Sequence, residues 1–524
     1  MMKWLVWLLM GGLVTGVEAQ ERPNVVVILV DDMGFSDVGC YGGEIPTPNL
    51  DRLAAEGVRF SQFYNAGRCC PSRASLLTGL YSHQAGIGHM AQDRGLPAYR
   101  GALNDRCVTL AEVLREAGYF TAHTGKWHVG DRDESMWPLQ RGFDRFYGSP
   151  TSNASYFGVK KGRMILSGNE RLYDHENPPP EGWHSTDAWT SKGLEFVDEA
   201  LKEKKPFFWY LAHNAPHFPL QAEPEDIARF RGKYRKGWDK VREERHARQQ
   251  ELVLMKGVGL SARDESVQAW EALDEQQKDE LDLRMAIYAA VVERLDKSIG
   301  VLVEGLKARG VFENTLLMFL SDNGASDEGG VYGKFGDGDG EPGSLESDVY
   351  AGRAWANASD TPFRLYKSFT HEGGIATPLV VHWPAGLKAR GEWRHEVGHV
   401  VDVMPTLVEL CGAAYPKSWK AREILPMEGS SLAAVLQGEK VQGRTLFWEH
   451  EGNAAVREGD WKLVRSKREG LKWRLYDLKE DRTELKDVSA GNAAKVEELR
   501  MKWKGWAERV GVVPFHELQG GMKK

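Results

Sequence analysis

The stretch Val25-Val26-Val27-Ile28-Leu29-Val30-Asp31-Asp32 decides the expected fold of the chain. A continuous apolar run rich in β-branched side chains is typical of a strand buried on both faces of a parallel sheet. Asp31 and Asp32 follow at the carboxyl end of this run, where open α/β sheets bind their ligands. Two adjacent carboxylates repel each other unless a cation neutralises them, and oxygen ligands suit a hard cation such as Ca²⁺. The structural alternative is a strand end exposed to solvent.

Strand-like and helical segments alternate along most of the chain. We expect helices at residues 47–57, 110–118, 285–306 and 400–410, and strands at residues 60–64, 119–122, 206–212, 315–320 and 378–383. Residues 149–190 are expected to be loop-rich, and the charge-dense residues 225–283 to form solvated helices on the outer face. The alternation predicts an α/β fold, a large doubly wound sheet, mixed but mostly parallel, flanked by helices.

The pattern changes near residue 440. Short strands separated by turn residues are expected at 445–449, 453–457, 461–464 and 473–477, followed by a helix at 493–507. The length of 524 residues is too great for one ordinary core. We therefore expect a large α/β domain over residues 20–439, and a smaller C-terminal α+β domain with an antiparallel sheet over residues 440–524.

Residues 1–19 have the pattern of a secretory signal peptide, with Lys3, an apolar run over residues 4–14 and Ala19 before the expected cleavage site. The run is shorter than the ~20 residues that span a bilayer, so no stable membrane anchor is expected. We therefore expect an exported protein, periplasmic or extracellular. The net charge of −7 leaves no basic footprint, which argues against nucleic acid as a partner.

The five cysteines are few for an exported protein, so a disulfide framework is not expected to hold the fold together. Their odd number leaves at least one thiol without a partner. One or two bridges remain possible, and their pairing cannot be deduced.

Polar side chains follow several of the expected strands. The residues in such positions are Lys126, His128, His217, Asp322 and Asn323. Lys126 and His128 are two positions apart, so in an extended segment both would point to the same side. Asp322 and Asn323 would add oxygen ligands to those of the two aspartates after the first strand. Such a set suits one Ca²⁺ better than zinc, for which thiolate or several imidazole ligands are expected.

A second motif, Cys69-Cys70-Pro71-Ser72-Arg73, opens an expected helix that ends at Gly79. Cys69 would lie at the helix N-terminus, where unpaired backbone N–H groups favour anions. The chain resembles the type I, formylglycine-dependent sulfatases of the alkaline phosphatase superfamily, and in particular the bacterial arylsulfatases. The resemblance rests on Cys69-x-Pro71-Ser72-Arg73, Leu77-Thr78-Gly79, Asp31-Asp32, Gly125-Lys126-Trp127-His128, Pro216-His217, Asp322-Asn323-Gly324, and Lys367 before Glu372-Gly373-Gly374.

The resemblance implies hydrolysis of sulfate monoesters of aryl or carbohydrate alcohols to the alcohol or phenol and inorganic sulfate, through a formylglycine-sulfate intermediate. It implies that a formylglycine-generating enzyme oxidises Cys69 to Cα-formylglycine, and that one Ca²⁺ is bound. The implied catalytic residues are Cys69, Arg73, Lys126, His128, His217 and Lys367. The implied metal ligands are Asp31, Asp32, Cys69, Asp322 and Asn323.

The same resemblance implies a role for each catalytic side chain. Arg73 would orient the hydrated formylglycine, Lys126 would bind the sulfate, and His128 would assist its elimination. His217 and Lys367 would contact the sulfate and protonate the leaving oxygen.

Two alternatives stay open. One is a phosphonate monoester or phosphodiester hydrolase, because similar cation-lined sites accept phosphoryl groups. The other is a catalytically silent, secreted carbohydrate-binding protein never oxidised at Cys69, against which the full set of charged residues argues. The alcohol portion of the substrate is expected to depend on loops at residues 149–190 and 330–360, and on Trp448, Glu449 and His450.

Overall fold

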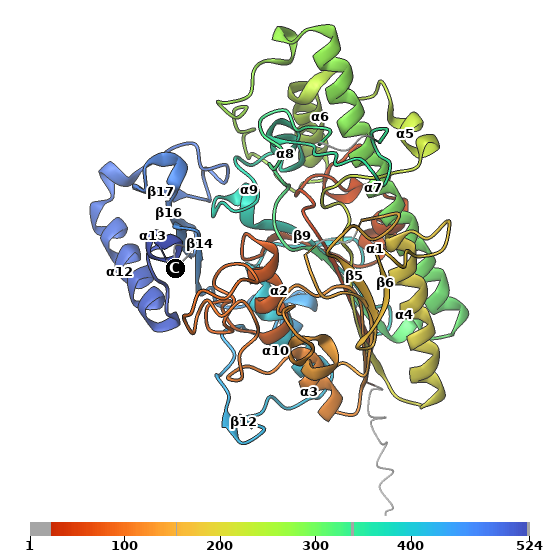
Figure 1. The fold of residues 1–524 in the computed structure, drawn as a ribbon. Helices are drawn as coiled ribbons and strands as arrows, with labels where there is room; N and C mark the ends of the chain where they lie inside the picture. Colours follow the sequence, from red (N-terminus) through yellow and green to blue (C-terminus); the bar gives the residue numbers. More distant parts are fainter. Residues whose placement is uncertain (1–21, 153–154, 337–339, 521–524) are drawn as a thin grey trace, which may run out of the picture.

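The computed structural model describes residues 22–152, 155–336 and 340–520 (Figure 1). Within them, a mixed sheet of eleven strands forms the centre of the larger part of the molecule. In spatial order these are β10 (Glu392–Arg394), β2 (Val58–Tyr64), β9 (Ala376–His382), β8 (Thr315–Ser321), β1 (Asn24–Val30), β7 (Phe207–Ala212), β3 (Phe120–Lys126), β4 (Arg145–Ser149), β5 (Met164–Ser167) and β6 (Glu170–Asp174), with β11 (Gly398–His399) beside β2. Strands β8, β1, β7, β3 and β4 run parallel, which confirms the predicted doubly wound, mostly parallel sheet.

Strand β1 lies in the middle of this sheet, between β7 and β8. Its side chains point alternately to the two faces of the sheet. Val26 and Ile28 pack in the hydrophobic core on one face, and Val25 and Val27 pack in the core on the other. All four side chains are fully buried. The predicted strand with two buried faces is therefore confirmed.

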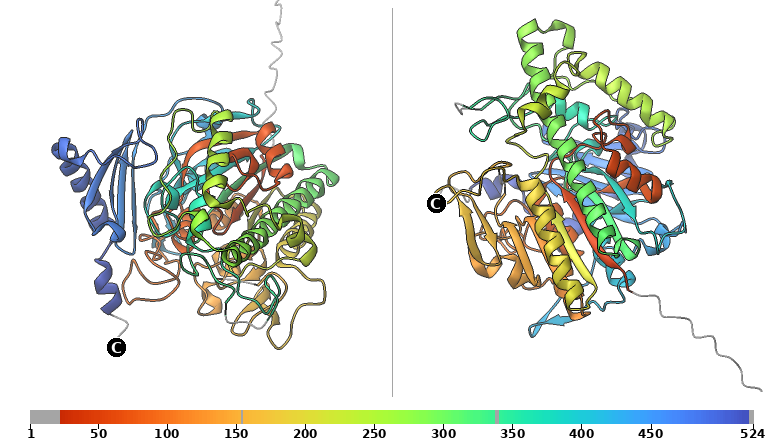
Figure 2. Two further views of the ribbon diagram at one scale, coloured as in Figure 1. Left: turned by 90° about the horizontal axis from the view of Figure 1, so that it is seen from above. Right: turned by 90° about the vertical axis from the view of Figure 1, so that its right-hand side faces the viewer.

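Helices cover both faces of the sheet (Figures 1 and 2). One face carries α1 (Pro48–Glu56), α4 (Ser185–Lys202) and α7 (Glu275–Ala308). The other face carries α2 (Cys69–Thr78), α3 (Leu110–Glu116) and α10 (Val403–Leu410). Helix α7 begins ten residues earlier than expected, because Asp274 and Gln277 form a capping box at its start.

Residues 149–190 contain more regular structure than the sequence indicated. Strands β5 and β6 form an antiparallel hairpin at the edge of the sheet, joined by Gly168 and Asn169. Gly168 has a φ of 64°, a conformation that favours glycine in such two-residue turns. The apolar alternation that marks a strand is missing from β6, because its residues are exposed or half-buried.

The expectation of solvated helices over residues 225–283 is wrong for one face of α6 (Gly237–Glu251). Arg245 on this helix is fully buried, with Nη1 2.7 Å from Asp37 Oδ1 and Nε 2.7 Å from Glu44 Oε2. A buried guanidinium needs such acidic partners because its charge is costly to remove from water. Both partners stand far earlier in the chain, so the local charge pattern did not indicate them.

Beyond residue 440, four strands form a separate antiparallel sheet: β14 (Thr445–His450), β15 (Asn453–Glu458), β16 (Trp461–Arg465) and β17 (Trp473–Asp477). Helix α12 (Ala493–Val510) packs on this sheet through Leu499 and Trp506. Figures 1 and 2 show this unit beside the larger part of the molecule. The predicted meander and closing helix are confirmed, and the domain boundary at residue 440 stays a prediction.

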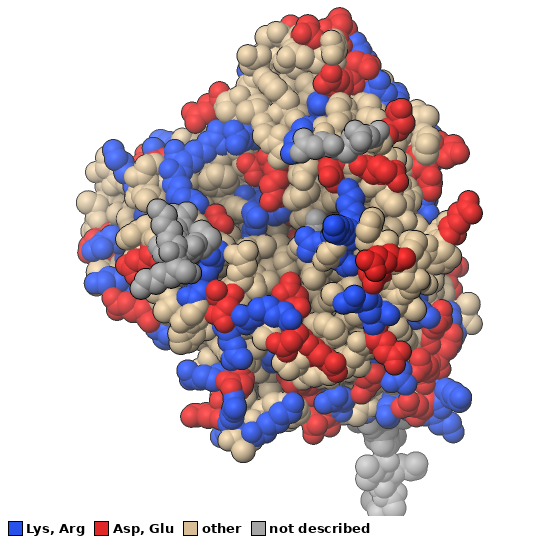
Figure 3. Space-filling model, viewed as in Figure 1, with Lys and Arg blue, Asp and Glu red and all other residues tan. Residues whose placement is uncertain are grey.

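The expected signal peptide lies outside the described residues. Over the part of the chain that the structure describes, no helix is both long enough and apolar enough to cross a membrane. All five cysteines lie in this part, where each is buried and unbridged. Lys and Arg side chains intermingle with Asp and Glu over the face shown in Figure 3, so this face carries a mixed charge.

Candidate active site

Six chain segments bring polar side chains to one edge of the sheet: the ends of four strands, the start of a helix, and the loop that carries Lys367. Strands β1, β3, β7 and β8 run parallel, so their carboxyl ends meet there, and α2 begins beside them. The Asp31 N–H donates to the Ala215 carbonyl, and the Asp322 N–H donates to the Val30 carbonyl, both at 3.0 Å. The residues that the structure brings together at this edge are Asp31, Asp32, Cys69, Arg73, Lys126, His128, His217, Asp322, Asn323 and Lys367.

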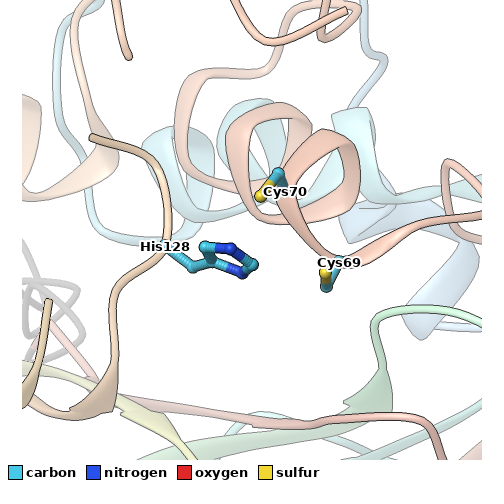
Figure 4. A group of neighbouring side chains, drawn as sticks. All are labelled: Cys69, Cys70 and His128. Carbon is cyan, nitrogen blue, oxygen red and sulfur yellow. The ribbon is translucent and has the colours of Figure 1, made fainter. Parts of the chain in front are cut away.

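Cys69 is the first residue of α2 and is only 2% exposed. Its sulfur lies within 4.8 Å of the Cys70 sulfur and of a ring nitrogen of His128 (Figure 4). The hydrogen bond with Cys70 lowers the pKa of Cys69 well below its usual range, and Lys126 and His128 add to this effect against the opposing effect of burial. The surroundings of residue 69 therefore favour a negative charge on it.

Lys126 and His128 both lie near Cys69, but the backbone that carries them has a different conformation from the one expected. Strand β3 ends at Lys126, and His128 has a left-handed φ of 58°, so the segment is not extended as predicted. Lys126 Nζ donates a hydrogen bond to Asp31 Oδ2. Burial lowers the pKa of His128 to about 4, which leaves its imidazole neutral at pH 7.

Arg73 follows Cys69 on the same helix and is fully buried. Its guanidinium forms hydrogen bonds with other residues of the chain. Nε and Nη2 both donate to Asp322 Oδ2, at 3.1 and 2.7 Å. Nη1 donates to the Lys126 carbonyl at 3.0 Å. Arg73 therefore joins the start of α2 to the ends of β3 and β8.

Asp32 is the centre of a second group of contacts. Lys367 Nζ donates to Asp32 Oδ2 at 2.7 Å, and His217 Nε2 lies 3.4 Å from the same oxygen. Asn323 Nδ2 donates to Asp32 Oδ1 at 2.7 Å. His217 Nδ1 lies 2.5 Å from the Phe218 carbonyl, which can only accept a hydrogen bond, so Nδ1 carries a proton, and Nε2 faces the Asp32 carboxylate.

The buried carboxylates differ in their electrostatics. Burial and the neighbouring Asp31 raise the pKa of Asp322 well above its usual range. Burial also opposes the charge of Asp31, but nearby cations, of which Lys126 has the greatest effect, lower its pKa overall. The positive side chains therefore outweigh the effect of burial at Asp31, whereas at Asp322 the ion pair with Arg73 offsets it only in part.

The oxygen atoms at this edge fit a hard divalent cation. Asp31 Oδ1 and Asn323 Oδ1 are buried and accept no hydrogen bond from any described residue. Carboxylate and amide oxygens are the ligands that Ca²⁺ prefers, and a cation beside them would also favour the charged form of Asp322. Oxygens of Asp31 and Asp32 lie within 4.8 Å of each other and of a His217 ring nitrogen.

The sequence did not indicate two further residues of the site. Glu328 Oε2 accepts a hydrogen bond from Lys367 Nζ at 2.8 Å, and Glu328 Oε1 lies 3.2 Å from Arg68 Nη2. The two side chains are 30% and 19% exposed, so they lie nearer the solvent than the rest of the site. The sequence signal for their presence in the site was position alone: Glu328 lies shortly after Asp322, and Arg68 directly precedes Cys69.

The expectation that Trp448, Glu449 and His450 contact substrate is not supported by their burial. Trp448 is 2% exposed and donates from Nε1 to the Asn65 carbonyl at 2.8 Å. Glu449 lies 3.0 Å from a ring nitrogen of His83, and His450 is fully buried. Strand β14 packs against the larger part of the molecule, so these three side chains are buried where the two parts meet.

The fold defines a class of protein, hydrolases of anionic esters with an alkaline-phosphatase-like fold, and the candidate site lies at strand ends and at a helix start. Residues 23–413 match the family model described as Sulfatase, and residues 363–505 match the one described as N-sulphoglucosamine sulphohydrolase, C-terminal. The chain belongs to the sulfatase family. It is a sulfuric ester hydrolase, an enzyme that hydrolyses sulfate monoesters, as the sequence resemblance predicted.

Relatives cover nearly the whole chain. An uncharacterized sulfatase of Schizosaccharomyces pombe is 34% identical over 529 residues, covering 94% of this chain and 95% of the relative. An arylsulfatase of Klebsiella aerogenes is 37% identical over 431 residues, covering 79% of this chain and 92% of the relative. The crystal structure of Ps i-CgsB in complex with k-i-k-neocarrahexaose matches with a TM-score of 0.68 at 27% identity, covering 93% of each chain.

Proposed function

We propose that this sulfatase hydrolyses sulfate esters of aryl or sugar alcohols with residue 69, converted by a formylglycine-generating enzyme, as its nucleophile. The observation that carries the proposal is the position of Cys69, buried at the first turn of α2 beside Lys126 and His128. Conversion to Cα-formylglycine would supply a hydrated aldehyde as the nucleophile toward sulfur. The motif Cys69-x-Pro71-Ser72-Arg73 supports this conversion.

We further propose that one Ca²⁺ is held by Asp31, Asp32, Asp322 and Asn323, with residue 69 as a further ligand. The unpartnered oxygens of Asp31 and Asn323 support this set. Bound there, Ca²⁺ would supply positive charge to the nonbridging oxygens of the sulfate group.

The lysines of the site would bind the sulfate. Lys126 and Lys367 are each about 1% exposed, so their charges act where water is excluded. Charge that develops on the sulfate oxygens would be stabilised by these fixed ammonium groups. Arg73 would act by orienting residue 69, because it lies one helical turn beyond that residue and anchors the helix to Asp322.

Three side chains can move protons. Lys367 Nζ would donate to the leaving oxygen, as would His217 Nε2 when both of its ring nitrogens carry protons, because both groups face Asp32. His128 is neutral at pH 7 and next to residue 69, so a ring nitrogen can accept a proton and assist the release of sulfate.

The alcohol portion of the substrate would lie against an aromatic wall. Phe218 and Tyr350 are stacked with ring centroids 4.5 Å apart, and with Glu328 they line a cavity beside Asp32. A flat apolar face suits an aryl group or a sugar ring. The named activity of the Klebsiella relative supports aryl sulfates, and the oligosaccharide in the Ps i-CgsB complex supports glycan sulfates. Residues 153–154 and 337–339 of the two substrate loops lie outside the described residues.

A substrate panel tests this function. The values of kcat/KM for p-nitrophenyl sulfate, for sulfated oligosaccharides and for a phenyl phosphonate monoester should rank a sulfate ester first. A preference for the phosphonate ester would support the phosphonate hydrolase alternative instead.

Mass spectrometry of the active enzyme tests the nucleophile. The peptide that contains residue 69 should carry the aldehyde, and Cys69→Ala should abolish turnover while the melting temperature stays close to that of the wild type. Active enzyme that contains only the thiol at residue 69 would reject the assignment.

We also propose that the protein is exported to the periplasm or the extracellular space after removal of residues 1–19. The pattern of charge, apolar run and small residues before Gln20 supports this. N-terminal sequencing of exported protein should begin at Gln20, and an intact Met1 on that protein would contradict cleavage.

A further inference from the structure

The first turn of α2 holds a set of metal-type ligands that is chemically different from the acidic set. Sulfur atoms of Cys69 and Cys70 and a ring nitrogen of His128 all lie within 4.8 Å of one another (Figure 4). The three residues are 2%, 0% and 4% exposed. His128 comes from the segment after β3, so two separate segments build the cluster.

A second observation also points to a ligand. His128 Nδ1 is buried and has no hydrogen-bond partner among the described residues. A buried imidazole nitrogen without a partner is costly, and a metal ion bound through Nδ1 would remove the cost.

The spacing of the three ligand atoms suits a tetrahedral ion. Zinc lies about 2.3 Å from thiolate sulfur and about 2.0 Å from imidazole nitrogen, so ligand atoms on one zinc ion are about 3.5–4 Å apart. The observed separations, all within 4.8 Å, need only small side-chain rotations to reach that arrangement. Thiolate and imidazole select thiophilic ions, whereas Ca²⁺ selects oxygen.

We propose that the chain with an unconverted cysteine at position 69 binds one thiophilic metal ion, with the chemistry of Zn²⁺, through Cys69, Cys70 and His128. Conversion of Cys69 replaces its sulfur with oxygen and leaves one thiol and one imidazole, fewer ligands than protein zinc sites use. Formation of formylglycine would therefore change the metal preference at residue 69 from thiophilic to oxygen-binding. Only the change of metal preference on conversion rests on the proposed function. Zinc binding by the unconverted chain does not.

Zinc binding by the unconverted chain is the direct test. The full chain is produced without formylglycine-generating activity, and mass spectrometry verifies the thiol at residue 69. After incubation with Zn²⁺ and an excess of Ca²⁺, which competes with Zn²⁺ for carboxylate and amide oxygens, the protein is dialysed and its zinc content measured. We expect one zinc ion per chain, and the affinity follows from competition with a chelator of known zinc affinity.

Variants assign the ligands. Cys70→Ser and His128→Gln should each weaken zinc binding by more than the roughly 10–100-fold that is typical of losing an outer-shell partner. Cys107→Ser is the matched control, because Cys107 is also buried but donates to the Asn104 carbonyl at 3.2 Å, away from this cluster. Circular dichroism verifies folding, and Cys70→Ala replaces Cys70→Ser if the serine variant does not fold.

Several results would overturn the proposal. These are a folded, unconverted wild type that retains no zinc, an unchanged affinity in Cys70→Ser, an equal loss in Cys107→Ser, or fully converted enzyme that binds zinc as tightly as the unconverted chain. The assay contains no sulfate ester, so failure of zinc binding leaves the proposed hydrolysis intact. Absence of formylglycine from active enzyme would reject the proposed nucleophile and leave the zinc result standing.

Discussion

Lys462 Nζ donates a hydrogen bond to Glu372 Oε1 at 2.8 Å, and both side chains are fully buried. Lys462 lies on β16 of the C-terminal sheet, and Glu372 begins α9 (Glu372–Ile375), five residues after Lys367. Asn453 of the same sheet donates from Nδ2 to the Ser368 carbonyl at 2.9 Å. The C-terminal sheet therefore holds the segment that presents Lys367 to the site.

Replacing Lys462 should destabilise the protein strongly. In Lys462→Met, the carboxylate of Glu372 stays buried without its closest cation, and breaking a buried pair in this way costs roughly 3–5 kcal/mol. The measurement is the free energy of unfolding in denaturant. Lys472→Met, at an exposed position before β17, is the control and should change it by no more than about 0.5 kcal/mol. Equal effects of the two changes would show that the buried pair is not what stabilises this junction.

His123 should contribute to acid sensitivity. Its ring stacks on Tyr210 and Phe146 at 4.9 and 5.0 Å, and burial lowers its pKa from 6.5 to about 3. Because the folded pKa lies below the unfolded one, the neutral ring stabilises the fold fully above pH 6.5. This contribution is lost as pH falls from 6.5 toward 3, by up to about 1.4 kcal/mol per pH unit.

The variant His123→Phe keeps an aromatic ring in this stack and removes the titrating group. The difference in unfolding free energy between pH 7.5 and pH 5.5 should therefore be smaller in the variant than in the wild type. The same difference in both proteins would contradict the effect of His123.

Lys126 should be needed for turnover. Lys126→Met removes the buried ammonium beside Asp31 and residue 69, and loss of one such stabilising group costs about 10²–10³ in kcat. Steady-state kinetics of fully converted enzyme measure the effect, and melting temperature reports any loss of fold. Lys388→Met, at an exposed position after β9, should leave kcat unchanged. A folded Lys126→Met enzyme with wild-type kcat would remove Lys126 from the proposed mechanism.

Removal of Ca²⁺ should lower activity reversibly. A chelator should inactivate the enzyme, and added Ca²⁺ should restore it, because the acidic oxygens at the strand ends provide the proposed ligands. Asn323→Ala should weaken Ca²⁺ binding in calorimetry, since it deletes one unpartnered oxygen. Full activity in a sample verified to be metal-free would reject the calcium site.

Glu328 should influence substrate preference. Its partly exposed carboxylate pairs with Lys367 and Arg68 and lines the cavity beside Asp32. In Glu328→Gln, the ratio of kcat/KM for a sulfated oligosaccharide to that for p-nitrophenyl sulfate should change by about tenfold or more. The reason is that loss of the carboxylate affects most the substrate whose alcohol portion forms a polar contact with it. Asp327→Asn, which affects the neighbouring acid near Arg353, is the control. An unchanged ratio in Glu328→Gln would contradict a role in specificity.

The sequence by itself determined the central strands and the residue types of the candidate site. Val25–Val30 could be identified as a strand because both of its faces are apolar, and Asp31 and Asp32 could be placed at its end because the apolar run stops there. The motif that begins at Cys69 indicated the family. Such signals are local, so they survive in a single sequence without knowledge of the other strands.

Only the tertiary structure decided which of these groups contact one another. The pairing of Glu328 with Lys367, the burial of Arg245 and the pair of Lys462 with Glu372 all join residues far apart in the chain. The positive φ of His128 was also not expected from its sequence. These features depend on how helices, strands and loops pack together, and packing between distant segments leaves no local pattern in the sequence.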